Sequence, residues 1–222
     1  MSESLNQLLA ALHAERVRTW DPNALRVNVE QRRTLVETAD RSTWVKAGDQ
    51  APDFRLAEVD GKELTLASLT AEGPVVLILF RFATCPACNI ALPYYARNLW
   101  PELKALGASL VAVSPQVPER LIEIKRKHGL EFQVASDLNR LGRALGVLYE
   151  FDDASKAAAQ ARGGFIGDTT GTGTWELPMP TVVVIDRAGR VVFADVSPDW
   201  LVRTEADPII ETVRALTLVA AE

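Results

Sequence analysis

The only two cysteines of this 222-residue chain, Cys85 and Cys88, lie three residues apart between two different structural patterns. Directly before them, Val75 to Phe80 form a nearly continuous apolar run, which is typical of a central strand covered on both faces. Directly after them, apolar residues recur at helical spacing. Two thiols at such a junction can close into a disulfide, so the pattern predicts redox chemistry.

The geometry of a helix start supports this prediction. We expect Cys85 at the N-cap and Pro86 in the first turn, where free backbone N–H groups and the helix dipole favour a thiolate. Residues three apart at a helix start have Cα atoms about 5–6 Å from each other, which suits an unstrained disulfide. A pair of inert buried thiols is the less favoured interpretation, because the Pro-Ala spacer suits an exposed turn.

A metal site is also disfavoured. Zinc needs four ligands, and His13 and His128 lie in separate predicted helices without ligand spacing. We therefore predict no metal and no organic cofactor, and we assign neither histidine a catalytic role.

Composition narrows the class of protein. The chain is 48% hydrophobic and 24% charged with a net charge of -5, which fits a globular protein with a large core. Its acidic balance disfavours binding to nucleic acid or to an anionic membrane, and no segment approaches the length of a membrane span. The first thirty residues contain no apolar region of the signal-peptide kind, so we expect a cytoplasmic location, where a lone cysteine pair is rarely structural.

Helical periodicity fills the first part of the chain. Leucines at helical spacing predict one helix from Leu5, and Asp21 followed by Pro22 marks the start of a second. We expect this extension, residues 1–45, to be a packing or dimerisation arm rather than a regulatory or substrate-covering element.

From residue 46 to 222 we expect one domain of alternating strands and helices. Its predicted strands are residues 54–59, 64–66, 75–80, 110–113, 132–135, 181–185 and 191–196. Its predicted helices are residues 86–106, with prolines at 93 and 101 that can break it, 118–128, a turn or two around 141–145, and 209–218. The Gly- and Thr-rich residues 163–173 read as a flexible connector. This order predicts a three-layer α/β/α sandwich around a mixed sheet.

Several short motifs in the chain resemble those of a known protein family. They are Gly-Asp-Gln-Ala-Pro-Asp-Phe at 48–54, Cys-Pro-Ala-Cys-Asn at 85–89, Val-Ala-Val-Ser-Pro-Gln at 111–116, Ser-Asp at 136–137 and Pro-Met-Pro-Thr at 178–181. With them, residues 47–196 resemble the peroxiredoxin-like branch of the alkyl hydroperoxide reductase and thiol-specific antioxidant family, in the thioredoxin-fold superfamily. The resemblance implies a thioredoxin-like fold and thiol-dependent peroxide reduction.

Three positions depart from the family pattern. That pattern has a proline seven residues before the attacking cysteine, a threonine three before it, and an arginine entering the late strand. If Cys88 is the attacking residue, these places hold Arg81, Cys85 and Pro180. The late proline resembles instead that of thioredoxin, which implies a cis bond before Pro180 and an exposed, attacking Cys85. Both orders of attack stay open.

The resemblance implies partners as well as a site. Cys85 and Cys88 would be catalytic, with Thr84, Arg81 and Pro180 as supporting residues, although an arginine at a strand end is more often solvated at the surface. A hydroperoxide would be the substrate, and thioredoxin or a similar dithiol the reductant. A homodimer is compatible with this reading. The alternatives are a protein disulfide oxidoreductase and a redox-sensing interaction module that uses the helical extension.

Overall fold

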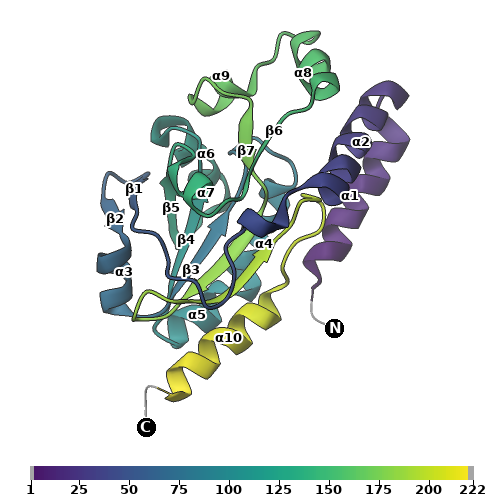
Figure 1. Ribbon diagram of the computed structural model, residues 1–222. Helices are drawn as coiled ribbons and strands as arrows, with labels where there is room; N and C mark the ends of the chain where they lie inside the picture. Colours follow the sequence, from purple (N-terminus) through teal and green to yellow (C-terminus); the bar gives the residue numbers. More distant parts are fainter. Residues whose placement is uncertain (1–2, 220–222) are drawn as a thin grey trace.

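The computed structural model describes residues 3–219 and is built around a seven-stranded mixed sheet (Figure 1). The strand order is β2-β1-β5-β4-β3-β8-β9. The strands of this sheet are β1 (Arg55–Glu58), β2 (Glu63–Thr65), β3 (Val75–Leu79), β4 (Ser109–Ser114), β5 (Gln133–Ser136), β8 (Thr181–Ile185) and β9 (Val191–Val196). A separate antiparallel pair joins β6 (Leu148–Glu150) to β7 (Glu176–Pro178).

Strand β3 lies at the centre because its sequence is apolar on both faces. All five of its residues are buried, and each such side chain contributes about 1.5–3 kcal/mol by leaving water. It pairs in parallel with β4, which pairs in parallel with β5, and antiparallel with β8. Since loops at the carboxyl ends of neighbouring parallel strands meet, the loops after β3 and β4 lie side by side.

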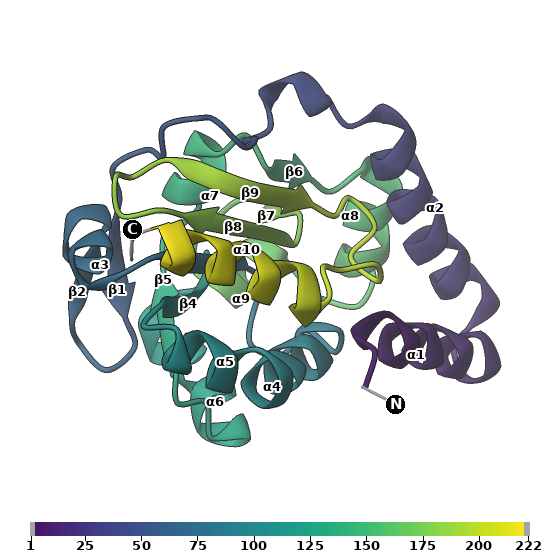
Figure 2. The ribbon, with the colours of Figure 1, turned by 90° about the horizontal axis from the view of Figure 1, so that it is seen from below.

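Helices cover both faces of the sheet. They are α3 (Leu66–Glu72), α4 (Cys88–Asn98), α5 (Trp100–Ala105), α6 (Pro118–His128), α7 (Arg140–Ala144), α8 (Asp153–Gln160), α9 (Ile166–Thr170) and α10 (Ala206–Val219). Figure 2 shows α4, α5, α6 and α10 on one side of the sheet, with α7 and the β6–β7 pair on the other. The predicted three-layer α/β/α arrangement is confirmed.

Two further helices, α1 (Leu5–Thr19) and α2 (Pro22–Thr38), lie beside α4 and α8 (Figures 1 and 2). The Asp21 carboxylate accepts hydrogen bonds from the backbone N–H groups of Asn23 and Ala24, so it caps α2 as predicted. Leu5 and Leu9 of α1 are fully buried. The two helices are therefore packed against the domain that the sheet forms.

Some local expectations are wrong. The single helix expected over residues 86–106 is two helices, because the backbone breaks at Leu99, shortly before Pro101, whereas Pro93 is accommodated inside α4. The expected flexible connector at 163–173 contains α9 and is held by hydrogen bonds. The short elements α3, α8, β6 and β7 were not predicted, since each is too brief to show a clear periodicity.

Within residues 3–219, no helix combines the length and apolar character that crossing a membrane requires.

Candidate active site

The two cysteines lie at the start of α4, in the loop that follows β3. Cys88 is the first residue of the helix and Ala87 its N-cap, so the expected N-cap position of Cys85 is wrong: Cys85 lies two residues before the N-cap. Thr84 and Pro86 are exposed, whereas Cys85 is only 2% exposed and Cys88 fully buried. The expected exposed dithiol is therefore also wrong: the turn reaches the surface while both thiols, which are free, point inward.

Side chains from α4 itself and from the loop after β4 hold this turn. Asn89 donates hydrogen bonds to the backbone oxygens of Ala83 at 2.6 Å and of Cys85 at 2.9 Å. The buried Gln116, in the loop after β4, accepts from the Ala83 N–H at 2.8 Å and donates to the oxygen of Thr169 in α9 at 3.0 Å. The cysteine turn is thus tied both to its own helix and to the neighbouring loops.

Cys88 is the more acidic of the two thiols. Burial alone would raise its pKa, but a hydrogen bond from Cys85 and the guanidinium of Arg203, whose Nη2 lies 3.5 Å from the Cys88 sulfur, hold the pKa well below the usual range. The pKa of Cys85 is raised well above its usual range by its hydrogen bond to Cys88, by burial and by the Cys88 charge. These opposite shifts favour the negative charge on Cys88 and the proton on Cys85.

Arg203 lies in the loop between β9 and α10 and is held on three sides. Its Nε donates to the backbone oxygen of Trp200 at 3.1 Å. Its backbone N–H donates to the Asn6 side-chain oxygen at 2.9 Å, and the Asn6 amide donates back to the Arg203 backbone oxygen at 2.8 Å. Helix α1 therefore fixes the backbone of the residue that contacts the thiolate.

Arg81 is beside the dithiol and is not the solvated surface residue that was favoured. Its guanidinium lies 4.4 Å from the centroid of the Trp200 ring and 5.5 Å and 6.0 Å from those of Phe82 and Phe151. Such stacking stabilises a cation that is only partly solvated. Its charge acts to lower the pKa of Cys85, so it belongs to the electrostatic surroundings of the pair.

The other two predicted site residues, Thr84 and Pro180, are less directly linked to the two thiols. Thr84 is exposed at the surface of the turn. Pro180 and Arg203 line the same small cavity of about 10 Å³, which also involves Tyr95. No peptide bond in residues 3–219 is cis, so the cis bond expected at Met179–Pro180 is wrong. The Pro180 backbone oxygen accepts a hydrogen bond from the Ser197 N–H.

Sequence reasoning missed Arg203. The family pattern places an arginine at the start of the late strand, where this chain has Pro180. The structure supplies a cation to Cys88 from more than twenty residues further along. A lone arginine in the run Trp200-Leu201-Val202-Arg203, just before an amphipathic helix, was the only available signal, and it specifies no partner.

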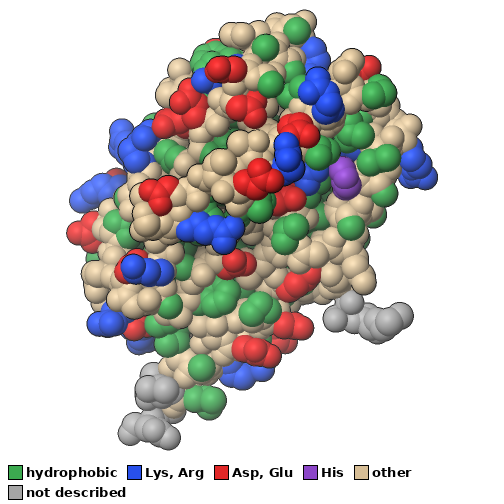
Figure 3. Space-filling model, turned by 45° about the vertical axis from the view of Figure 1, so that its right-hand side comes forward, with side chains coloured by type: hydrophobic (Ala, Val, Ile, Leu, Met, Phe, Trp, Pro, Cys, Tyr) green, Lys and Arg blue, Asp and Glu red, His purple; other side chains and the backbone are tan. Residues whose placement is uncertain are grey.

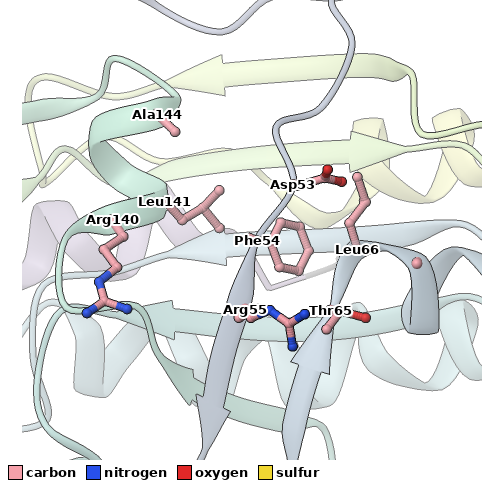
Figure 4. A pocket seen from close by; sticks show the side chains of 9 residues that line it. Asp53, Phe54, Arg55, Thr65, Leu66, Arg140, Leu141 and Ala144 are labelled. Atoms are coloured by element: carbon pink, nitrogen blue, oxygen red, sulfur yellow. The ribbon is translucent and has the colours of Figure 1, made fainter.

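Other pockets lie away from this site. Figure 4 shows a cavity of about 550 Å³ between β1, β2 and α7, lined by Phe54, Leu66 and Leu141 with two exposed arginines, Arg55 and Arg140. It contains none of the predicted site residues. Histidine, cysteine and carboxylate side chains in residues 3–219 form no group of three or more suited to a metal ion.

Comparison with known proteins gives a family match over most of the chain. The family described as the AhpC/TSA family matches residues 47–194, which include all of β1 to β8 and the cysteine turn. Helices α1 and α2 lie outside the matched region, as does Arg203.

Individual relatives match shorter segments. Peroxiredoxin Bcp of Escherichia coli K12 is 34% identical over 94 residues, which are 42% of this chain and 58% of that protein. The thiol-disulfide oxidoreductase ResA of Halalkalibacterium halodurans is 33% identical over 100 residues, 45% of this chain and 54% of that protein. The chain thus spans little more than half the length of these relatives.

The crystal structure of peroxidoxin BcpB from Mycobacterium tuberculosis has a similar fold, with a TM-score of 0.59 and 24% identity over 78% of this chain and 98% of that one. A peroxiredoxin-like protein from Aquifex aeolicus gives a TM-score of 0.60 at 18% identity, over 78% of this chain and 88% of that one. The fold is therefore thioredoxin-like.

Proposed function

Because this chain belongs to the AhpC/TSA family, we propose that it is a thiol peroxidase in which Cys88 attacks the peroxide and Cys85 resolves the product. The observation that carries this assignment is the guanidinium of Arg203, 3.5 Å from the buried Cys88 sulfur. Of the two orders of attack, the low pKa of Cys88 and the raised pKa of Cys85 support this one.

The reaction balances with the two thiols alone and one external dithiol. The Cys88 thiolate attacks the terminal oxygen of the hydroperoxide, so an S–O bond forms, the O–O bond breaks, and the alkoxide leaves and takes a proton from water to become an alcohol. Cys88 is then a sulfenic acid. The Cys85 thiol condenses with it, which forms the disulfide and releases water, and a reducing dithiol returns both cysteines to thiols.

A low pKa is not sufficient for this activity. Lowering a thiol pKa from about 8.5 to about 6.5 raises the thiolate fraction at pH 7 about 24-fold, but costs about 8-fold in nucleophilicity, a net gain of roughly threefold. The larger effect has to come from charge that stabilises the transition state, where negative charge moves onto the peroxide oxygens. Arg203 is the group placed to do this, and Arg81 is the second candidate.

A protein disulfide oxidoreductase is the second candidate function. The Cys-x-x-Cys spacing and the similarity to ResA proteins support it. The burial of both sulfurs opposes it, because a protein disulfide can reach Cys85 only if the turn around Thr84 and Pro86 opens, whereas a hydroperoxide group is small.

The remaining expectations complete the proposal. Thioredoxin or a similar dithiol would be the reductant, and a cytoplasmic location would provide it. Residues 1–45 would form a helical extension of a domain that spans residues 46–222, with residues 1–2 and 220–222 outside the described part of the chain.

The proposal is tested by rapid mixing of the reduced protein with substoichiometric hydrogen peroxide, followed by tryptophan fluorescence. Trp200 is a suitable reporter, since its backbone oxygen binds the Nε of Arg203. We expect oxidation much faster than that of a free thiol with the same thiolate fraction. A rate equal to that of the free thiol, together with rapid reduction of insulin disulfides, would instead establish the second candidate function.

A further inference from the structure

Asn89, the second residue of α4, links the cysteine turn to the end of helix α6. Its Nδ2 donates hydrogen bonds to the backbone oxygens of Ala83 at 2.6 Å and of Cys85 at 2.9 Å. Its Oδ1 lies 2.9 Å from Nζ of Lys127 and 2.8 Å from Nε2 of His128, the last two residues of α6. We call these four contacts the Asn89 bridge.

The direction of each hydrogen bond in the Asn89 bridge is determined by the backbone oxygens. Because these oxygens only accept, the amide nitrogen of Asn89 faces them and the amide oxygen faces α6. His128 therefore donates through Nε2, and burial together with the Lys127 charge lowers its pKa, so the ring is neutral at pH 7. The amide nitrogen thus donates two bonds and the amide oxygen accepts two, which fixes the orientation of the Asn89 side chain.

The ammonium group of Lys127 is bonded to this neutral amide and to no carboxylate. On the face that includes α1 and α2, acidic and basic side chains are intermixed (Figure 3), and the exposed Arg18 pairs there with Glu15. Within residues 3–219, no carboxylate lies at ion-pair distance from Lys127, whose Nζ donates to Asn89 instead. A hydrogen bond from a charged donor is roughly twice as strong as one between neutral groups. Lys127 therefore contributes substantially to the Asn89 bridge.

The proposed reaction requires the cysteine turn to open once in each cycle. A reducing dithiol has to attack one sulfur of the Cys85–Cys88 disulfide, and the thiol with the lower pKa leaves more readily. Cys88 is that leaving group, since its pKa is lowered and Arg203 lies beside its sulfur. The attack then falls on Cys85, which is only 2% exposed when the turn is closed.

This reduction takes place as two thiol–disulfide exchanges. In the first, the external thiolate bonds to the Cys85 sulfur, the Cys85–Cys88 bond breaks, and Cys88 leaves as a thiolate. In the second, the other thiol of the reductant closes the reductant's own disulfide and expels Cys85, which takes the proton that this thiol gives up. Both exchanges involve the Cys85 sulfur, so both depend on an open turn.

We propose that the Asn89 bridge holds the cysteine turn closed, so that Lys127 and His128 control the access of the reducing dithiol to Cys85. This inference rests on the proposed function and concerns its reductant. The two backbone oxygens that the amide holds belong to the residues on either side of Thr84, the exposed residue of the turn. An amide that loses its bonds to α6 is free to rotate away, which releases both oxygens together.

Labelling of Cys85 with N-ethylmaleimide measures the opening of the turn without any peroxide. In a Cys88→Ser background Cys85 is the only thiol, and the reagent is neutral, so changes in protein charge affect its approach little. We expect His128→Leu and Lys127→Met each to raise the labelling rate about tenfold, because each removes one hydrogen bond of the Asn89 bridge.

Three further variants in the same background separate this positioning role from general destabilisation. His128→Gln retains a donor at the place of Nε2 and should restore the slow labelling of the parent. Arg126→Met removes the exposed neighbouring cation, which has no bond to Asn89, and should also label slowly. Asn89→Asp keeps the acceptor for α6 but loses the donor to the turn, so it should label about tenfold faster. Equal labelling rates for His128→Leu and His128→Gln would overturn the proposal.

The disulfide form separates this proposal from the peroxidase function. Oxidation of the chain that has both cysteines by diamide forms the disulfide without any peroxide, and dithiothreitol should then reduce it about tenfold faster in His128→Leu than in the wild type. If labelling and reduction both respond while hydrogen peroxide reacts only as fast as with a free thiol, the peroxidase function fails and the role of the Asn89 bridge stands. If hydrogen peroxide reacts rapidly but neither rate changes in His128→Leu, the role of the bridge is refuted and the peroxidase function stands.

Discussion

The matched core and the two ends of the chain make different contributions to the site. The core, residues 47–194, supplies the thiols and the strand-to-helix turn that positions them. The ends supply positive charge and its support, since Arg203 comes from the loop before the last helix and its backbone is held by Asn6 of the first helix. A reactive thiol can therefore be recognised locally, whereas the charge that sets its chemistry comes from distant parts of the chain.

The strongest test of the core's contribution is to remove each thiol separately. Cys88→Ser should lower the rate of oxidation by hydrogen peroxide by about 100-fold or more, because the remaining Cys85 thiol is still buried, which raises its pKa, and the Arg203 guanidinium contacts the Cys88 position and not Cys85. Cys85→Ser should still form a sulfenic acid, which a dimedone-type reagent traps and mass spectrometry detects. The reverse result, a trapped sulfenic acid in Cys88→Ser only, would mean that Cys85 attacks.

The next test addresses the contribution of the chain's end. Arg203→Met should raise the pKa of Cys88, because a buried thiolate loses its closest cation, and should slow peroxide reduction about 10²–10³-fold. The ultraviolet absorbance of the thiolate as a function of pH measures the first effect, and rapid mixing measures the second.

Arg190→Met is the matched control for this change. Arg190 is exposed in the turn before β9, so its loss changes the net charge equally without touching the site. If the two variants behave alike, then Arg203 acts only through the overall charge of the protein, and the assigned role of its contact with Cys88 is wrong.

The difference between local and distant contributions also explains how far the sequence predicts the structure. Strand β3 and helix α6 were predicted to within a residue, because apolar runs, prolines and glycines act over short distances: Gly129, for example, ends α6 in the left-handed conformation. The contact between Arg203 and Cys88 joins residues 115 apart and depends on how a loop folds back over the sheet. No local pattern encodes such a contact.

The prediction that the two thiols are exposed was wrong for a similar reason. A Cys-Pro-Ala-Cys turn predicts an exposed start of a helix, and the turn is indeed exposed at Thr84 and Pro86. Whether the sulfurs face outward depends on what packs against them, and here Arg203 and the bonds that Gln116 makes belong to other elements. Local geometry therefore located the site, and tertiary packing determined its accessibility.

Glu205 gives a test of how firmly α1 is attached. Its carboxylate accepts from the N–H groups of Leu5 and Asn6, the Ser4 hydroxyl and the Tyr94 hydroxyl, and these bonds, despite burial, lower its pKa from 4.5 to about 2. A depressed pKa contributes stability that is present above the unfolded value of about 4.5 and is lost as the pH falls toward 2.

Glu205→Gln should therefore lower the free energy of unfolding by about 2–3 kcal/mol at pH 7. Urea denaturation at several pH values measures this, and the difference between wild type and variant should shrink as the pH falls from 4.5 toward 2. A difference that is constant over this range would show that the ionised carboxylate does not hold the helix.

The smallest expected effect, on Asn6, most directly links the extension to the chemistry. Asn6→Leu removes both hydrogen bonds to the Arg203 backbone, so the guanidinium should sample positions further from the Cys88 sulfur. We expect the rate of peroxide reduction to fall about three- to tenfold. A change of this size corresponds to the free energy that about one hydrogen bond contributes to positioning the guanidinium. The pH profile of the reaction should shift upward with the pKa of Cys88, a change that loss of stability alone would not produce.

Gln7→Leu alters the adjacent, exposed residue of the same helix and should leave the profile unchanged. If the profile of Asn6→Leu also stays in place, α1 only packs against the domain, and the contrast between a core that holds the thiols and ends that tune them would apply to Arg203 alone.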